Sequence, residues 1–292
     1  MMQIGRNSSS VLFVGLITAC VAFDLFTRLH VFPLVIFLAA TAAIHEATRM
    51  AHRTGACPWR LGAWALVMFF VLDGWHAALT HADIILMVGL IGLFVHAITH
   101  SVRSAFASVG SALLCALWVG AGFGSLLALW SWNGVDGVSR EGRYLIVFLL
   151  PTAMAQDVFA MWVGSALGRR RITPYISPNK SLEGSIGGVA GSLLMGLLIW
   201  GIFERFEHSV QGLPLSGFMA WHDAVALSLL FGTVGQLGDL AESLLKREAG
   251  VKDSGTTYTG HGGVLDLFDS VLFCAPVMYL WAFARGLWMF GP

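Results

Sequence analysis

The chain has 292 residues, of which 57% are hydrophobic and 12% are charged, and its formal net charge is zero. Soluble domains usually carry about 25% charged residues, so this composition indicates an integral membrane protein held in a lipid bilayer. Since a balanced charge creates no global field that would attract polyanions, we expect no nucleic-acid partner.

Apolar runs long enough to cross a bilayer as helices, about 20 residues each, divide most of the chain. They predict an all-α protein with about nine transmembrane helices. We expect one polytopic membrane domain over 1–292, in which the helices of 1–140 form a scaffold and 141–292 supply the catalytic helices and loops. The predicted spans are 11–29, 31–50, 60–80, 83–100, 105–131, 143–165, 185–204, 222–245 and 265–289.

The basic residues predict the orientation of these spans, because cytoplasmic loops carry an excess of Lys and Arg. Most of the basic residues fall in the N-terminus and in every second loop. The N-terminus is therefore expected in the cytoplasm and the C-terminus outside. This assignment also places the two most polar loops, 166–184 and 246–263, together on the cytoplasmic side.

The stretch 237–269 contains more charge than membrane segments usually tolerate, since a carboxylate in a span costs about 2.5–3.5 kcal/mol on insertion scales. Two acidic helix faces flank one polar loop, and carboxylate oxygens without nearby thiolates suit Mg²⁺. Asp266 and Asp269 form the second face, at spacing i, i+3. The first face, at i, i+3, i+7, consists of Asp239, Glu242 and Lys246, with Ser243 and Arg247 beside it.

The loop between these faces contains Gly260-His261-Gly262-Gly263, directly before an apolar helix. Free backbone N–H groups and a positive helix end are expected to point at a bound anion here. Together with Lys246, Arg247 and Lys252, the loop predicts a cradle for several phosphates; the alternative is a flexible turn whose cations only follow the positive-inside rule. For His261 we favour positioning or charge neutralisation over proton abstraction, because a phosphomonoester is already largely ionised at pH 7.

Three further polar positions stand out. The run Ser177-Pro178-Asn179-Lys180-Ser181-Leu182-Glu183 predicts a turn entering a helix, with Ser181 and Glu183 in the first turn; a purely structural cap is the alternative. Asp157 is a lone acid in a predicted span, which favours a polar cavity over lipid. We interpret Glu46 as a helix-end carboxylate paired with Arg49 or Arg53.

The order of these residues resembles a known signature. The segments Ser243–Arg247, Lys252-Asp253 and Gly260–Asp269 resemble the C-terminal signature of the phosphatidate cytidylyltransferases, also called CDP-diacylglycerol synthases. Residues 177–188 resemble the second motif of that family, and Asp157 with Gly164 resembles the segment before it. The detailed resemblance covers roughly residues 155–270.

The resemblance implies a nucleotidyltransferase that converts CTP and phosphatidic acid to CDP-diacylglycerol and pyrophosphate in phospholipid biosynthesis. It implies Mg²⁺ or another divalent cation on Asp239 and Asp266, with Asp269 and Glu242 as further candidates. The expected location is the bacterial inner membrane, with the active site facing the cytoplasm, and a homodimer is one assembly considered. The implied catalytic residues are Lys246, Arg247, Lys252, Asp253 and His261, and the implied substrate-binding residues are Asp157, Ser177, Lys180, Ser181, Glu183, Ser243, Gly262 and Gly263.

Two positions depart from the family pattern, because Leu267 and Ser165 stand where the family usually has arginine. Each departure removes a partner for phosphate or carboxylate and concerns the lipid substrate more than the reaction class. One alternative is a divergent paralogue that acts on another lipid phosphate or as a lipid kinase. A transport or non-catalytic protein is another, although transporters usually show repeat symmetry, which this sequence does not show.

Overall fold

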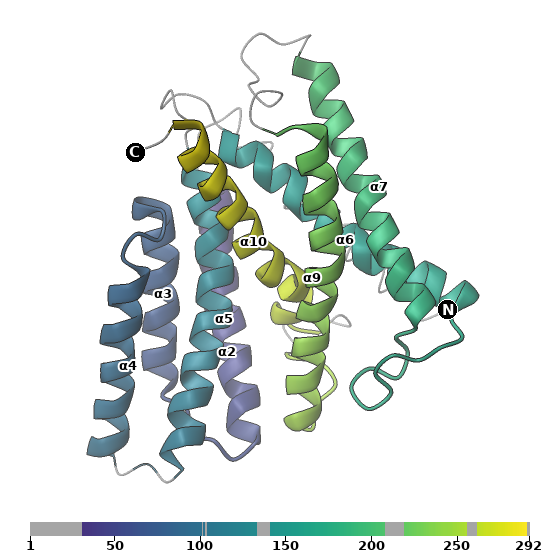
Figure 1. Cartoon of the computed structure of the whole chain (residues 1–292). Coiled ribbons are helices and arrows are strands. Elements are labelled where there is room, and N and C mark those ends of the chain that lie inside the picture. Colours follow the sequence, from purple (N-terminus) through teal and green to yellow (C-terminus); the bar gives the residue numbers. More distant parts are fainter. Residues whose placement is uncertain are drawn as a thin grey trace.

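The structure, a computed structural model, describes residues 31–100, 102, 104–132, 141–207, 219–255 and 262–290 (Figure 1). These residues are organised almost entirely in helices, and the regular elements that they form contain no β-sheet. The helices are α2 (Val31–Arg53), α3 (Arg60–Ala77), α4 (Ala82–Thr99), α5 (Ala105–Ser131), α6 (Glu141–Leu167), α7 (Leu182–Glu207), α9 (Trp221–Glu248) and α10 (Leu265–Phe290).

Every predicted span from 31–50 onward coincides with one of these helices, and the predicted span 11–29 lies outside the described residues. Seven of the described helices are long and apolar enough to cross a membrane. Helix α3 is not among these seven, because its 18 residues include Arg60, Asp73 and His76. The fold is therefore that of an all-helical integral membrane protein with seven candidate spans in its described part.

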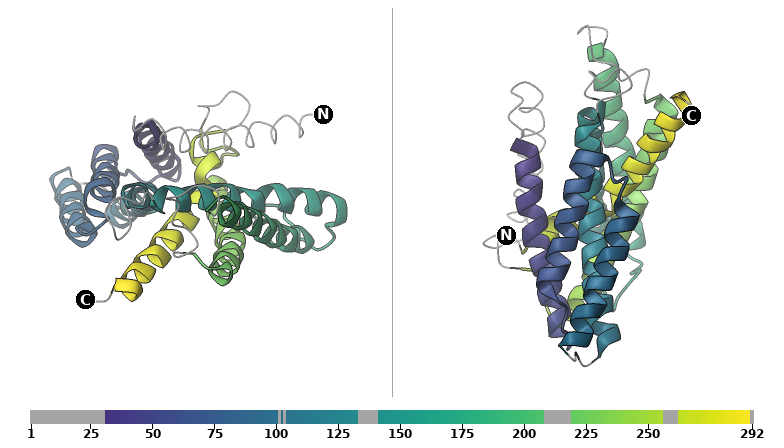
Figure 2. Two further views of the ribbon diagram at one scale, coloured as in Figure 1. Left: turned by 90° about the horizontal axis from the view of Figure 1, so that it is seen from above. Right: turned by 90° about the vertical axis from the view of Figure 1, so that its left-hand side faces the viewer.

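Helix α10 joins two groups of helices. Figure 1 shows α2 to α5 on the left and α7 and α9 on the right, with α10 running obliquely between the groups, and Figure 2 shows the same crossing from two other sides. Helix α10 contacts α9, α5, α6 and α2. An edge-to-face contact between Phe123 of α5 and Phe268 of α10, with ring centroids 5.0 Å apart, fixes one of these crossings. The first turns of α10 therefore lie among helices from both halves of the chain.

Glycines bring the helices around this crossing close together. A Cβ atom on Gly184 would lie 2.7 Å from the Ala160 carbonyl oxygen, so α7 can approach α6 only because residue 184 has no side chain. In the same way, a Cβ atom on Gly238 would lie 2.6 Å from the Asp269 carbonyl oxygen. The start of α10 thus meets α9 well before α9 ends at Glu248, and the acidic residues of both helices share one level of the bundle.

Candidate active site

The acidic face predicted on α9 is buried at Glu242 and Lys246 and partly exposed at Asp239. Lys246 Nζ lies 2.9 Å from Glu242 Oε2, one helical turn away, and the Glu242 side chain has no exposed surface. Ser243 is also buried, and its hydroxyl lies 3.5 Å from Asp239 Oδ1. A buried carboxylate costs several kcal/mol unless a cation offsets its charge, so Lys246 stabilises this face by remaining charged.

Asp266 connects this face to the loop before α10. Lys246 Nζ donates to Asp266 Oδ1 at 2.6 Å, which makes the lysine a bridge between α9 and α10. The other oxygen, Oδ2, accepts hydrogen bonds from Ser254 N at 2.9 Å, Ser254 Oγ at 2.7 Å and Gly263 N at 2.6 Å. The Asp266 carboxylate is therefore the centre to which the lysine and both ends of the loop converge.

A second lysine comes from the loop before α7. Lys180 Nζ lies 2.6 Å from Asp239 Oδ2 and 3.4 Å from the Gln236 carbonyl oxygen. Arg247 Nε donates to the Ile176 carbonyl oxygen at 3.2 Å. This is a second contact between α9 and the loop before α7. The two polar loops predicted to share one side of the membrane thus meet at one end of the bundle, and each carries a lysine to a predicted metal carboxylate.

The other predicted residues of the 177–188 loop make structural contacts. Ser181 Oγ accepts the Gly184 N–H at 3.1 Å, as in a helix N-cap. Glu183 Oε2 accepts the backbone N–H groups of Arg169 at 3.0 Å and Arg170 at 3.2 Å. Ser177 closes the turn through its carbonyl oxygen, which accepts the Lys180 N–H. These contacts are those of the structural cap, and substrate binding by Ser177, Ser181 and Glu183 stays a prediction.

Asp157 lies deeper, on α6, where Ser270 Oγ of α10 donates to its Oδ2 at 3.1 Å. Asp269 belongs to the same layer, because it directly precedes Ser270 in α10 and its carbonyl oxygen packs against Gly238, the residue before Asp239. Helices α6, α9 and α10 and the loops before α7 and α10 therefore contribute to a single polar region. At the outer edge, Lys252 and Asp253 are exposed, and His261 lies outside the described residues.

The glycine-rich loop differs from the prediction in one respect. The N–H groups of Gly263, Val264 and Leu265 were expected to be free for an anion, yet they donate to protein carboxylates, Gly263 to Asp266 and the other two to Glu46. Gly262 has φ +89°, which L side chains rarely adopt. Residues 262 and 263 must therefore be glycine in order to wrap around two carboxylates, and a direct role in substrate binding stays a prediction.

Glu46 was wrongly interpreted as a helix-end residue. It is 4% exposed, and it accepts hydrogen bonds from the Ser254 hydroxyl, Val264 N and Leu265 N at 3.1, 3.1 and 2.9 Å. In the described part of the chain, no ion pair joins it to Arg49 or Arg53. The structure extends this helix to Arg53, so Glu46 lies about two turns inside it, whereas the predicted span ended at residue 50, about one turn after Glu46.

Ser165 and Leu267, which stand where the family usually has arginine, have uncharged side chains. Ser165 is exposed, and its hydroxyl donates to the Trp162 carbonyl oxygen at 2.9 Å within α6. Leu267 is half-buried and packs against the hydrophobic core. Ser165 therefore forms a hydrogen bond within α6 and Leu267 packs against the core, and neither side chain supplies a positive charge.

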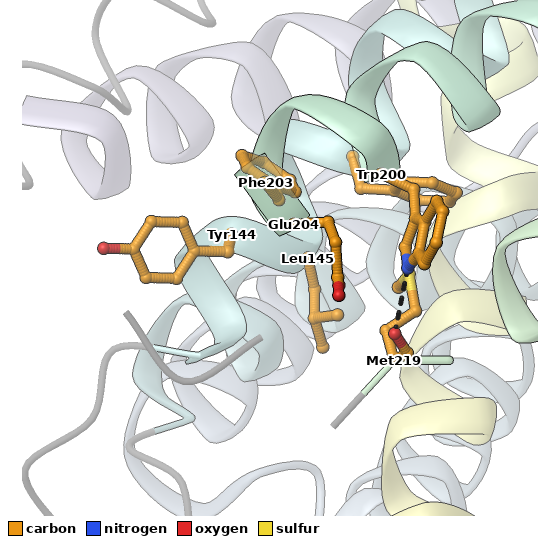
Figure 3. A pocket seen from close by; sticks show the side chains of 7 residues that line it. Tyr144, Leu145, Trp200, Phe203, Glu204 and Met219 are labelled. Atoms are coloured by element: carbon orange, nitrogen blue, oxygen red, sulfur yellow. Dashed lines mark hydrogen bonds between the residues drawn. The ribbon is translucent and has the colours of Figure 1, made fainter. Parts of the chain in front are cut away.

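A pocket at the other end of the helices is not this site. Figure 3 shows it between α6 and α7, where Trp200 donates to the Met219 carbonyl oxygen at 3.1 Å. The described residues that form its walls are apolar and aromatic apart from Glu204, and no lysine or arginine is among them. A phosphate-bearing substrate has no cation to meet there, so the polar region around Asp239 and Asp266 is the candidate active site.

The packing of Gly263 makes a prediction about stability. A Cβ atom at this position would lie 2.3 Å from both Glu46 Oε2 and Ser254 Oγ, so Gly263→Ala should destabilise the protein by about 1–3 kcal/mol. Gly201→Ala in α7, where an added Cβ meets nothing within 4 Å, is the matched control. Thermal unfolding in detergent should show a lower Tm for the first variant alone. Equal Tm values would contradict the packing around Glu46.

Similarity to known proteins shows the family of this chain. The model of the cytidylyltransferase family matches residues 6–284. The chain is 31% identical to the phosphatidate cytidylyltransferase of Bacillus subtilis over 257 residues, which are 85% of this chain and 87% of that protein. The protein of that name from Synechocystis is 45% identical over 138 residues, 47% of this chain and 43% of its own length. The phosphatidate cytidylyltransferase of Brucella abortus is 38% identical over 160 residues, which are 55% of this chain and 53% of that protein. The chain therefore belongs to the cytidylyltransferase family.

Proposed function

We propose that this protein is a nucleotidyltransferase that makes CDP-diacylglycerol and pyrophosphate from CTP and phosphatidic acid, as part of phospholipid biosynthesis. The observation that carries the proposal is the pair of lysine–carboxylate contacts, Lys180 with Asp239 and Lys246 with Asp266, inside a helical membrane protein of the cytidylyltransferase family. The names of the relatives from Bacillus subtilis and Synechocystis support the choice of lipid.

The proposed reaction needs no strong base, but it needs cations that balance the charge of the phosphates. An oxygen of the lipid phosphate attacks the α-phosphorus of CTP, a new P–O bond forms, and the bond to pyrophosphate breaks. The attacking phosphate is already ionised at pH 7, so the residues need not remove a proton from it. Lys180 and Lys246 would balance phosphate charge inside the site, and Arg247 and Lys252 at its outer edge would hold the triphosphate. The catalytic roles predicted for His261 and Asp253 remain part of the proposal.

A divalent cation, which we take to be Mg²⁺, completes the proposal. One oxygen of Glu242, Oε1, is buried without a hydrogen-bond partner among the described residues, and such an acceptor fits a nearby cation. The described residues contain no group of three His, Cys, Asp or Glu arranged as a metal site. This fits Mg²⁺, which usually takes one or two carboxylates and shares substrate phosphates. Asp239 and Asp266 would hold it, with Glu242 and Asp269 beside them, and it would supply positive charge to the phosphates.

The membrane topology is part of the same proposal. We place nine spans in a bacterial inner membrane, with the N-terminus in the cytoplasm, the C-terminus outside and the active site facing the cytoplasm. Support comes from the end of the bundle where Lys180, Lys246 and Arg247 meet, since that end has the basic loops expected in the cytoplasm. CTP would enter from the cytosol while the acyl chains of the lipid stay in the bilayer.

Purified protein supplied with CTP, phosphatidic acid and Mg²⁺ tests the function directly. We expect pyrophosphate release and lipid-linked CMP in equal amounts, both abolished by EDTA and restored by excess Mg²⁺. Product with another lipid phosphate but none with phosphatidic acid would overturn the substrate assignment and keep the reaction class. Transfer of a phosphoryl group without pyrophosphate release would favour a lipid kinase instead.

A further inference from the structure

Glu46 stands apart from the other acids of the site, because it comes from α2 in the N-terminal half of the chain. It lies 208 residues before Ser254, with which it shares a hydrogen bond, and its buried carboxylate accepts the first N–H groups of the segment that opens α10. A buried carboxylate is unfavourable unless donors surround it. Glu46 is therefore tied to residues 254–255 and 263–265 on either side of the loop.

The Ser254 hydroxyl links Glu46 to Asp266. Its oxygen lies 3.1 Å from Glu46 Oε2 and 2.7 Å from Asp266 Oδ2. A hydroxyl has one hydrogen, so Ser254 can donate to only one of the two carboxylates at a time. The backbone donors of the described residues are divided between the two carboxylates: Gly263 N and Ser254 N donate to Asp266, whereas Val264 N and Leu265 N donate to Glu46.

The loop also fits tightly around the Glu46 side chain. A Cβ atom on Gly255 would lie 2.4 Å from Glu46 Oε1, and one on Gly263 would lie 2.3 Å from Glu46 Oε2. Both glycines therefore pack directly on the carboxylate, one before and one after the part of the loop that lies outside the described residues. Residue 46 is therefore in direct contact with the backbone that precedes Asp266.

From this geometry we propose that Glu46 is a positioning residue for the reaction. Its carboxylate fixes the backbone of residues 254–255 and 263–265, and this backbone orients Asp266 toward Lys246 and the substrate phosphates. Glu46 also occupies the N–H groups at the start of α10, so that Asp266 and the lysines, rather than the helix end, meet the substrate. The inference rests on the proposed function and assigns to α2 a part in it.

Chemical rescue of Glu46→Ala distinguishes positioning from general structural support. We expect kcat to fall about tenfold or more, because two or more hydrogen bonds to a charged group are lost, while KM for CTP changes less than twofold. Added acetate should enter the vacated space, accept the same N–H groups and restore part of kcat with saturation. Glu248→Gln, an exposed residue at the end of α9, is the control and should show neither loss nor response to acetate.

Hydrogen exchange provides a readout that does not depend on the reaction. The Val264 and Leu265 amides should exchange faster in Glu46→Ala than in the wild type, and acetate should slow them again. This result is expected even if CTP and phosphatidic acid prove to be the wrong substrates, so the two proposals fail separately. If Glu46→Ala does not fold, Glu46→Gln serves the same purpose, because its NH₂ group must face backbone donors. Wild-type kcat in Glu46→Gln, or lost kcat in Glu46→Ala without rescue by acetate, would overturn the positioning role.

Discussion

Replacement of Asp266 by asparagine is expected to abolish lipid-linked CMP formation while the protein still inserts into the membrane. The physical reason lies in the donors around its carboxylate, with Lys246 on one oxygen and Ser254 and Gly263 on the other. An asparagine NH₂ group must face donors in either orientation. Hydrogen bonds to charged groups contribute about 1.5–3 kcal/mol each, so losing two corresponds to a rate loss of roughly 100-fold or more.

Turnover of phosphatidic acid by purified protein in nanodiscs measures this effect. Asp83→Asn is the matched control, because Asp83 is exposed in the first turn of α4, at the opposite end of the bundle from the lysines. The control should retain wild-type turnover, and both variants should be extracted from membranes in the same amount. Turnover in Asp266→Asn within tenfold of the wild type would show that Asp266 is not an essential carboxylate.

Of the proposed single substitutions, Lys246→Met is expected to lower the stability of the folded protein most. The ammonium group lies between Glu242 and Asp266, at 2.9 and 2.6 Å, and Glu242 is fully buried. Removing one partner of a buried ion pair usually costs about 3–5 kcal/mol, because the other charge remains without compensation. Thermal unfolding followed by tryptophan fluorescence should show a clearly lower Tm.

A double variant separates the lost charge from the lost side chain. Glu242→Gln combined with Lys246→Met removes both charges of the helical pair and should recover much of the Tm lost in Lys246→Met alone. Coupling between contacting residues of about 0.5–3 kcal/mol is usual in such cycles. If the two substitutions lower Tm additively, Lys246 does not stabilise the fold through Glu242.

The sequence predicted helix positions well, because a helix that crosses a bilayer needs about 20 predominantly apolar residues. The described helices begin and end within a few residues of the apolar runs, as in α5, where Ala105–Ser131 matches the run 105–131. The convergence of the two polar loops was also predictable, since charge placed them on one side of the membrane. Asp239, Glu242 and Lys246 followed from helical periodicity alone and lie together as expected.

Contacts between segments that are distant in the sequence could not be predicted from local patterns. Nothing in the local pattern around Glu46 indicates Ser254 or Leu265, because their proximity depends on how α2, α5 and α10 pack. The same limit applies to Glu183, whose carboxylate binds two backbone N–H groups across the loop before α7. A local pattern shows that an acid is present in the membrane, but only packing shows which donors surround it.

The link between Glu46 and the 254–265 segment has a consequence for biosynthesis. A ribosome adds about 5–20 residues per second, so Glu46 emerges roughly 10–40 s before Ser254, which lies 208 residues later. During this interval α2 must enter the bilayer with a carboxylate to which Ser254, Val264 and Leu265 cannot yet donate. The contacts that join Glu46 to the surroundings of Asp266 therefore form last, when the first and last thirds of the protein meet.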